Sequence, residues 1–164
     1  MKKSFTGKVW KYGDNINTDV IFPGKYTYQK MEPSEMATHA LEDLDPDFAT
    51  GVQEGDIIVG GKNFGMGSSR EQAAVAIKAA GVSLIIAKSF ARIYFRNAIN
   101  AGMPAIKSPE AVEAIEAGDL ITINMEKGEI ITPKGTFSFP PYPDTVLNIL
   151  DKNGLIGFIK STLK

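Results

Sequence analysis

The sequence predicts a mixed α/β fold with a central βαβ unit and a β-meander in its C-terminal half. Residues 56–60 and 82–87 are short apolar runs of strand length, and residues 69–80 between them have the pattern of a helix. After Asp119 the hydrophobic period changes to two, which is typical of half-buried strands joined by tight turns. No repeat, low-complexity tract or linker divides the chain, so we expect residues 1–164 to form one domain.

Composition indicates a globular protein without a nucleic-acid or membrane partner. Apolar residues make up 43% of the 164 residues and charged residues 23%, which is ordinary for a soluble domain. The net charge is −1 with both signs interspersed, so no basic surface for nucleic acid is expected. No apolar run approaches membrane-helix length, and no apolar leader follows the first lysines, so we expect a cytoplasmic protein.

The absence of cysteine excludes several chemistries. The chain has no thiol to form a disulfide, act as a nucleophile, or bind zinc or an iron–sulfur cluster. It has one histidine, His39, which is expected at a helix flank or the core edge. We therefore expect no metal and no cofactor to be bound by this chain itself.

The N-terminal part begins with an alternating strand at residues 5–12 and then a turn-forming segment at 13–19. On local chemistry Asp19 is expected to make an Asx turn or cap. The following loop, residues 25–30, is polar and aromatic. A helix is expected from Pro33 or Ser34 to about Leu44.

The second half continues the alternation of strands and helices. The segment 88–92 follows the strand 82–87, so its side chains are expected at the same sheet edge as the loop after residue 60. The other expected elements are helices at 93–101, 109–118 and 145–152 and meander strands at 120–125, 129–132 and 136–139.

The glycine-rich stretch 60–71 is the candidate site. It follows a predicted strand and precedes a predicted helix, and Ser68 and Glu71 have the spacing of a capping box. With Ser68 as N-cap, free N–H groups at the helix start would attract an anion, and glycines such as Gly67 would let it approach closely. Arg70, in the same turn, fits a carboxylate with two parallel hydrogen bonds.

Known glycine motifs do not account for this stretch. A dinucleotide fingerprint fails because Arg70 occupies its last glycine position, and the Gly-Lys-Ser/Thr of a phosphate-binding P-loop is missing. A hydrolase elbow fails because Arg70 follows Ser69. A plain glycine turn into a capped helix would explain Ser68 and Glu71, but not the extra glycines, the second serine and the arginine. Both interpretations stay open on the residues alone.

The arginines support recognition of a carboxylate. The chain has three arginines against fifteen lysines, and Arg70, Arg92 and Arg96 all lie in or after the glycine-rich stretch. Arginine is favoured over lysine where a planar carboxylate is bound.

Three segments together resemble the swivel domain of the aconitase superfamily. They are residues 63–71, the pair 17–19 and 22–24, and residues 88–92. The length and the order of these motifs are similar to the free-standing small-subunit family of 3-isopropylmalate dehydratase. The resemblance implies a swivelling β/β/α domain that docks on a large subunit holding a [4Fe–4S] cluster, with the active site between the two.

The resemblance also implies roles for individual residues. Ser68 would be the alkoxide base that removes a proton next to a carboxylate, and Asp19 would pair with a histidine of the large subunit. Arg70 would bind a substrate carboxylate. The other residues expected to bind substrate are Gly67, Ser69, Tyr26, Thr27 and Tyr28.

The loop at Tyr26–Gln29 bears on the substrate. In the related enzymes this loop reads the distal part of the substrate, and an arginine occurs there when an extra carboxylate is bound; here it has none. We therefore expect an uncharged substituent on the substrate. The resemblance implies that the substrate is a 2-hydroxy dicarboxylic acid, with 3-isopropylmalate first. The alternatives are a homoaconitase-like or an alkylmalate or citramalate-type dehydratase subunit. From another class, a non-catalytic carboxylate-binding regulatory domain would need the amides and Arg70 but not Ser68.

Overall fold

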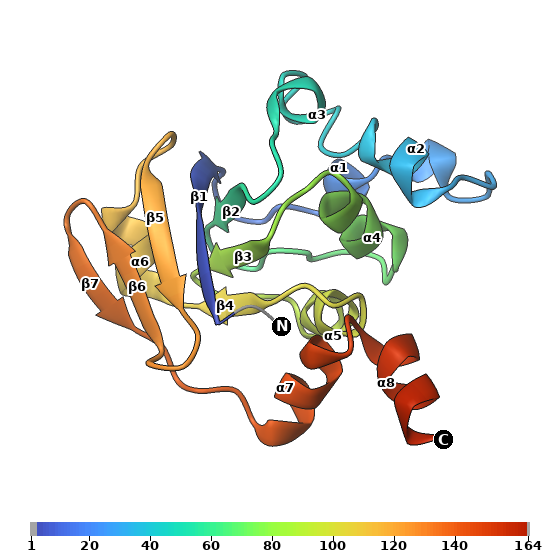
Figure 1. Ribbon diagram of the computed structural model, residues 1–164. Helices are drawn as coiled ribbons and strands as arrows, with labels where there is room; N and C mark the ends of the chain where they lie inside the picture. The colour runs from blue at the N-terminus through green and yellow to red at the C-terminus, as the bar shows by residue number, and fades with distance from the viewer. Residues whose placement is uncertain (1–2, 164) are drawn as a thin grey trace.

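The computed structural model describes residues 3–163, in which seven strands form one mixed sheet with helices on both faces (Figure 1). The strand order is β4-β3-β2-β1-β5-β6-β7. The strands are β1 (Ser4–Lys11), β2 (Ile57–Gly60), β3 (Leu84–Ala87), β4 (Ala105–Lys107), β5 (Leu120–Asn124), β6 (Glu129–Thr132) and β7 (Gly135–Ser138).

The sheet changes character at β1. Its first half, Ser4 to Lys8, pairs antiparallel with β5, and its second half, Val9 to Lys11, pairs parallel with β2. Strands β2, β3 and β4 continue the parallel side, whereas β5, β6 and β7 form the antiparallel meander and turn away from it (Figure 1). The mixed α/β class, the central βαβ unit and the meander predicted from the sequence are confirmed.

Most helices lie on one face of the parallel strands, where α4 and α5 pack, and α6 lies on the other face (Figure 1). The helices are α1 (Thr18–Ile21), the 3₁₀ helix η1 (Gly24–Tyr26), α2 (Pro33–Ala37), α3 (Phe48–Gly51), α4 (Gln72–Ala79), α5 (Arg92–Asn100), α6 (Pro109–Ala114), α7 (Asp144–Asp151) and α8 (Leu155–Thr162).

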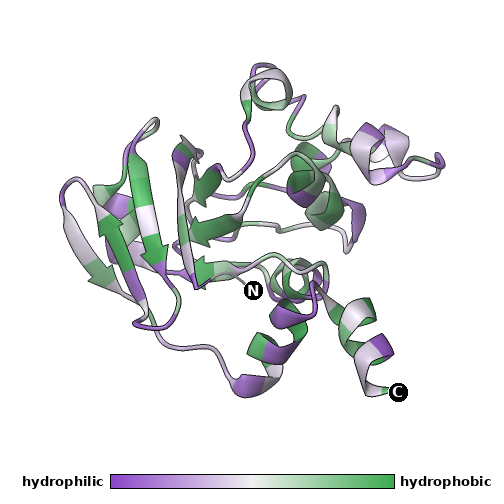
Figure 2. Ribbon diagram, in the orientation of Figure 1, coloured by the Kyte–Doolittle hydropathy of each residue, from purple (hydrophilic) through white to green (hydrophobic). Residues whose placement is uncertain are grey.

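The apolar core is split between the two faces of the sheet. Ile58 and Ile85 point into the cluster under α4 and α5, while their neighbours Ile57 and Leu84 point into the cluster under α6. Because both faces are buried, these strands are continuous apolar runs without alternation. Figure 2 shows these hydrophobic residues concentrated in the strands and in α4. The core thus fixes the parallel strands, and the loops at their carboxyl ends rest on it.

The start of the motif helix differs from the prediction. Helix α4 begins at Gln72, Glu71 is in the N-cap position, and no side chain caps it. The expected start at residue 69 and the Ser68 capping box are therefore wrong. Residues 68–70 instead run alongside α1, where the Ser68 carbonyl and the Arg70 side chain hydrogen-bond to residues of that segment.

The helix expected from residue 33 to 44 is also shorter. Helix α2 ends at Ala37 and turns follow it to residue 45. Leu41 has a positive φ of 57°, and its N–H donates to the carbonyl of Ile21 rather than to its own helix. Since Leu41 is fully buried, its tertiary contacts override the local helical pattern.

Five elements were not predicted: the short helices α1, η1 and α3, strand β4 and helix α8. Strand β4 has three residues after Pro104, too few to show a period in sequence. Helix α8 follows the Asn153-Gly154 stop, where both residues have positive φ, so the chain turns and begins a second helix. Helix α7 starts at Asp144, one residue before the expected start, with Pro143 in the N-cap position.

Candidate active site

The candidate site is made by three loops that leave the carboxyl ends of β1, β2 and β3. Backbone bridges join Asn17 to Met66 and Phe64 to Phe90, so the loop after β2 is held between the other two. The Phe64 N–H donates to the Ser89 carbonyl at 3.0 Å, and the Gly65 N–H donates to the Ile16 carbonyl at 2.8 Å. The predicted meeting of these loops at one sheet edge is confirmed, and open α/β sheets bind ligands at this edge.

Two glycines are required for this loop to pass between its neighbours. Gly65 has φ of +86°, and a Cβ there would lie 2.1 Å from the ring of the buried Tyr94. Gly67 has φ of +98°, and a Cβ there would lie 2.8 Å from the side-chain oxygen of Asn17. Both positions combine a left-handed backbone with a contact too close for any side chain, so they accept only glycine without a rearrangement.

Arg70 is buried and fastens the motif loop to the segment around α1. Its Nη1 donates to Thr27 Oγ1 at 2.7 Å, and its Nη2 lies 2.9 and 2.6 Å from the carbonyl oxygens of Thr18 and Phe22. Nη2 also lies 2.8 Å from Asp19 Oδ1. The side chain is only 9% exposed, and its Nε has no acceptor in the described chain. A buried N–H without an acceptor is costly, so the hydrogen bonds of the two Nη atoms must offset this penalty.

Asp19 does not cap α1 as expected. Asn17 is the N-cap, and its side-chain oxygen accepts from the Asp19 N–H at 2.7 Å. The Asp19 carboxylate is free of the helix end and forms the ion pair with Arg70, while its side chain remains 60% exposed. It can therefore face a partner from the same edge that carries the motif loop.

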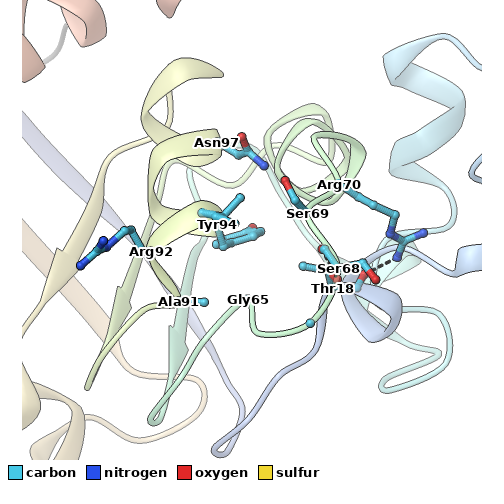
Figure 3. A pocket seen from close by; sticks show the side chains of 11 residues that line it. Thr18, Gly65, Ser68, Ser69, Arg70, Ala91, Arg92, Tyr94 and Asn97 are labelled. Atoms are coloured by element: carbon cyan, nitrogen blue, oxygen red, sulfur yellow. Dashed lines mark hydrogen bonds between the residues drawn. The ribbon is translucent and has the colours of Figure 1, made fainter.

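A cavity of about 250 Å³ opens beside the motif loop (Figure 3). Ser68 and Ser69 line it, both are exposed, and neither hydroxyl has a partner among residues 3–163. Figure 3 shows Ser69 directed towards Asn97 of α5, whereas the Arg92 side chain points away from the cavity. Asn97 and Tyr94 are wall residues that the sequence did not indicate, because nothing near them in the chain marks them as polar site residues.

The backbone adds hydrogen-bond donors to this wall. None of the N–H groups of residues 67–71 has an acceptor in the part of the chain that the structure describes. Successive free amides before a helix, in a loop that also carries Arg70, favour an anion. The anion site stays a prediction, and because α4 starts later than expected its donors would belong to the loop before the helix.

The loop expected to read the substrate is partly engaged in internal contacts. The Tyr26 hydroxyl donates to Glu42 Oε1 at 2.9 Å and its ring stacks on His39, with ring centroids 4.1 Å apart. Burial and the Glu42 contact raise the pKa of Tyr26, so its hydroxyl stays protonated. Thr27 accepts from Arg70, but Tyr28 is 98% exposed. Of the residues expected to bind substrate in this loop, Tyr28 is the one with a free side chain.

The described residues offer no place for a metal ion. No group of three or more His, Cys, Asp or Glu side chains is arranged for coordination within residues 3–163. In that same range, no helix combines the length and apolar character needed to cross a bilayer. The free amides of residues 67–71 and the Ser68 and Ser69 hydroxyl groups can together bind an anion.

Comparisons with known proteins agree with the motifs. The aconitase C-terminal domain family matches residues 1–111. The 3-isopropylmalate dehydratase small subunit of Caldicellulosiruptor bescii is 53% identical over 162 residues, which cover 98% of this chain and 97% of that protein. Small subunit 1 of the Thermotoga maritima enzyme is 52% identical over 156 residues, covering 94% and 93%.

A solved structure extends the comparison to the fold. The crystal structure of 3-isopropylmalate dehydratase (leuD) from Methanocaldococcus jannaschii superposes with a TM-score of 0.91 at 40% identity, covering 97% of this chain and 95% of that one. Sequence and fold therefore match the same proteins over nearly their whole length, and the predicted resemblance is confirmed. The chain belongs to the small-subunit family of 3-isopropylmalate dehydratase, a hydro-lyase of the aconitase family.

Proposed function

We propose that this chain, as one domain over residues 1–164, is the small subunit of a cytoplasmic 3-isopropylmalate dehydratase. The enzyme would isomerise its 2-hydroxy dicarboxylic substrate by removing water and adding it back. The observation that carries this proposal is the unpartnered Ser68 hydroxyl among free amides, next to the buried Arg70, in a chain about half identical to such subunits. Each feature matches a need of the reaction. The Ser68 hydroxyl would supply the base, the free amides would stabilise a negative charge, and Arg70 would hold a carboxylate of the substrate.

Ser68 would act as the base. Its Oγ would take the proton from the carbon next to a substrate carboxylate, which requires the alkoxide form. An alkoxide is hard to make in water, but free backbone N–H groups and a nearby guanidinium favour the charged form. Arg70 would bind a substrate carboxylate, because it lines the same cavity as Ser68 and carries a guanidinium group.

This chain does not fit an iron–sulfur cluster, since it has no cysteine and its described residues form no group of metal ligands. We therefore assign the [4Fe–4S] cluster, a Lewis acid for the leaving hydroxyl group, to the large subunit. Asp19 is exposed at the edge that would meet that subunit, and there it would pair with a histidine.

The isolated chain is expected to be colourless and inactive, and to gain activity only when a cluster-bearing large subunit is added. The measurement is absorbance of the purified chain and turnover of the reconstituted complex with a panel of alkylmalates, with 3-isopropylmalate as the best substrate. Iron–sulfur absorbance in the isolated chain would contradict the assignment of the cluster. A complex that turns over none of the alkylmalates would contradict the proposed function.

Replacing Tyr28 by arginine is expected to shift preference towards substrates with a distal carboxylate. Tyr28 is free and its loop carries no cation other than Lys25 and Lys30 at its ends, so the wild-type loop favours an uncharged alkyl group. A charged hydrogen bond contributes about 1.5–3 kcal/mol, so the ratio of kcat/KM between the two substrate types should change roughly 10- to 100-fold.

The matched control for this change is Tyr28→Phe, which removes the hydroxyl group without adding charge and should leave that ratio close to the wild-type value. If Tyr28→Arg also leaves it unchanged, the exposed tyrosine contacts the partner or solvent and does not read the substrate.

A further inference from the structure

We infer that Thr18 is a positioning residue for Ser68, an inference that rests on the proposed function of Ser68 as the base. Thr18 lies in the first turn of α1, 50 positions before Ser68 in the chain, and is only 2% exposed. Thr18 is one of the residues that line the cavity, and its hydroxyl group donates to the backbone of the motif loop.

All three hydrogen-bonding groups of Thr18 bind this loop. Its N–H donates to the Met66 carbonyl at 2.8 Å, its Oγ1 donates to the Ser68 carbonyl at 2.8 Å, and its carbonyl accepts from Arg70 Nη2 at 2.9 Å. The partners are the alternate residues 66, 68 and 70, which lie on both sides of the bend at Gly67 and Ser68. One threonine therefore fixes the register of the motif loop against α1.

The bond to the Ser68 carbonyl is the one that bears on catalysis. Within residues 3–163 this carbonyl has no other donor, and Ser68 itself is exposed. Because a trans peptide is planar, holding the carbonyl towards Thr18 directs the Ser69 N–H to the opposite side. In the described part of the chain that N–H has no acceptor, so the same hydrogen bond directs a free donor away from α1. It also sets the backbone angle on which the placement of Ser68 Oγ depends.

Gly67 makes this bond important. With φ of +98° and no side chain, it offers the backbone before Ser68 little restraint of its own. The position of Ser68 then depends on what holds the loop from outside, and among side chains of the described residues this is the Thr18 hydroxyl together with Arg70.

The test replaces Thr18 by valine, which keeps the shape and both backbone bonds but removes the hydroxyl donor, and by serine, which keeps the donor. In the reconstituted complex, Thr18→Val should lower kcat roughly 10- to 100-fold with KM changed much less, since a small misplacement of a reacting group can cost about 10²-fold. Thr18→Ser should retain a kcat close to that of the wild type.

A double-mutant cycle with Ser68→Ala shows whether Thr18 acts through Ser68. If it does, Thr18→Val should have little further effect once Ser68 is alanine. An equal loss in both backgrounds, or an equal loss for the valine and serine variants, would overturn the inference in favour of a purely structural role. So would a wild-type kcat for Thr18→Val.

A readout without turnover separates this inference from the proposed function. In amide NMR spectra of the isolated chain, Thr18→Val should shift or broaden the Ser69 resonance, while Thr18→Ser should leave it near its wild-type position. An unchanged Ser69 resonance in the valine variant overturns the positioning role. A complex inactive on every alkylmalate, with the Ser69 shift present, rejects only the proposed function.

Discussion

Replacing Ser68 by alanine in the reconstituted complex is expected to lower kcat by about 10²–10⁴-fold, the usual contribution of a general base. KM should change much less, because the base acts in the transition state and contributes little to binding of the ground state. Ser68 is exposed and its hydroxyl has no partner in the described chain, so the melting temperature should stay at the wild-type value. The measurement is steady-state kinetics with thermal unfolding of the isolated subunit.

Ser69→Ala is the matched control for this prediction. Ser69 lines the same cavity, is also exposed, and its hydroxyl likewise has no partner in the described chain, so the two variants differ in which oxygen is removed. Figure 3 shows Ser69 directed towards Asn97, so its hydroxyl belongs to another part of the wall. If Ser69→Ala proved the damaging change and Ser68→Ala the mild one, the base would be Ser69.

The sequence predicts the sheet well because its signals there are local. The apolar runs at 56–60 and 82–87 are the buried strands β2 and β3 within two residues at their ends, and the period of two after Asp119 is the meander. Burial on both faces leaves little choice of residue, so the pattern is strong. Neighbouring parallel strands end at the same edge of the sheet, so the loops that follow them lie together there. This is why the sequence could place the site at the carboxyl edge of the sheet.

The details of the site could not be predicted, because they depend on contacts between distant residues. Ser68 and Glu71 have the spacing of a capping box, yet α4 starts at Gln72, since Thr18 and the Arg70 side chain hold the preceding residues elsewhere. Nothing in the sequence around Thr18 indicates a partner 50 residues away. Local spacing correctly selected the residues of the motif loop, but not their backbone conformation.

Arg70 is the clearest case of a residue whose contacts with distant residues could not be predicted. Its place in the motif indicates a carboxylate ligand, but the structure engages both Nη atoms with protein oxygens, from Thr27 to the carbonyls of Thr18 and Phe22. The residue therefore has a structural role that the sequence did not reveal, in addition to the proposed contact with substrate. A substitution should then affect both stability and binding.

Arg70→Lys is expected to lower the free energy of unfolding by about 1–3 kcal/mol, because one ammonium group cannot reach all the acceptors that two Nη atoms and a planar fork reach. In a domain of this size that corresponds to a fall in melting temperature of several degrees, at roughly 2–4 °C per kcal/mol. In the reconstituted complex KM should also rise, since a lysine ammonium group does not occupy the place of the guanidinium proposed to contact the substrate. Thermal unfolding and steady-state kinetics on the same preparations measure the two effects.

Arg96→Lys is the control, because Arg96 is exposed on α5 and makes no hydrogen bond or ion pair with residues 3–163. It should change neither the melting temperature nor KM, which separates the effect of the site from that of an arginine-to-lysine change in general. A lower melting temperature with an unchanged KM in Arg70→Lys would make Arg70 a purely structural residue. A raised KM with an unchanged melting temperature would mean that its bonds to Thr18, Phe22 and Thr27 contribute no stability, and that its guanidinium serves the substrate alone.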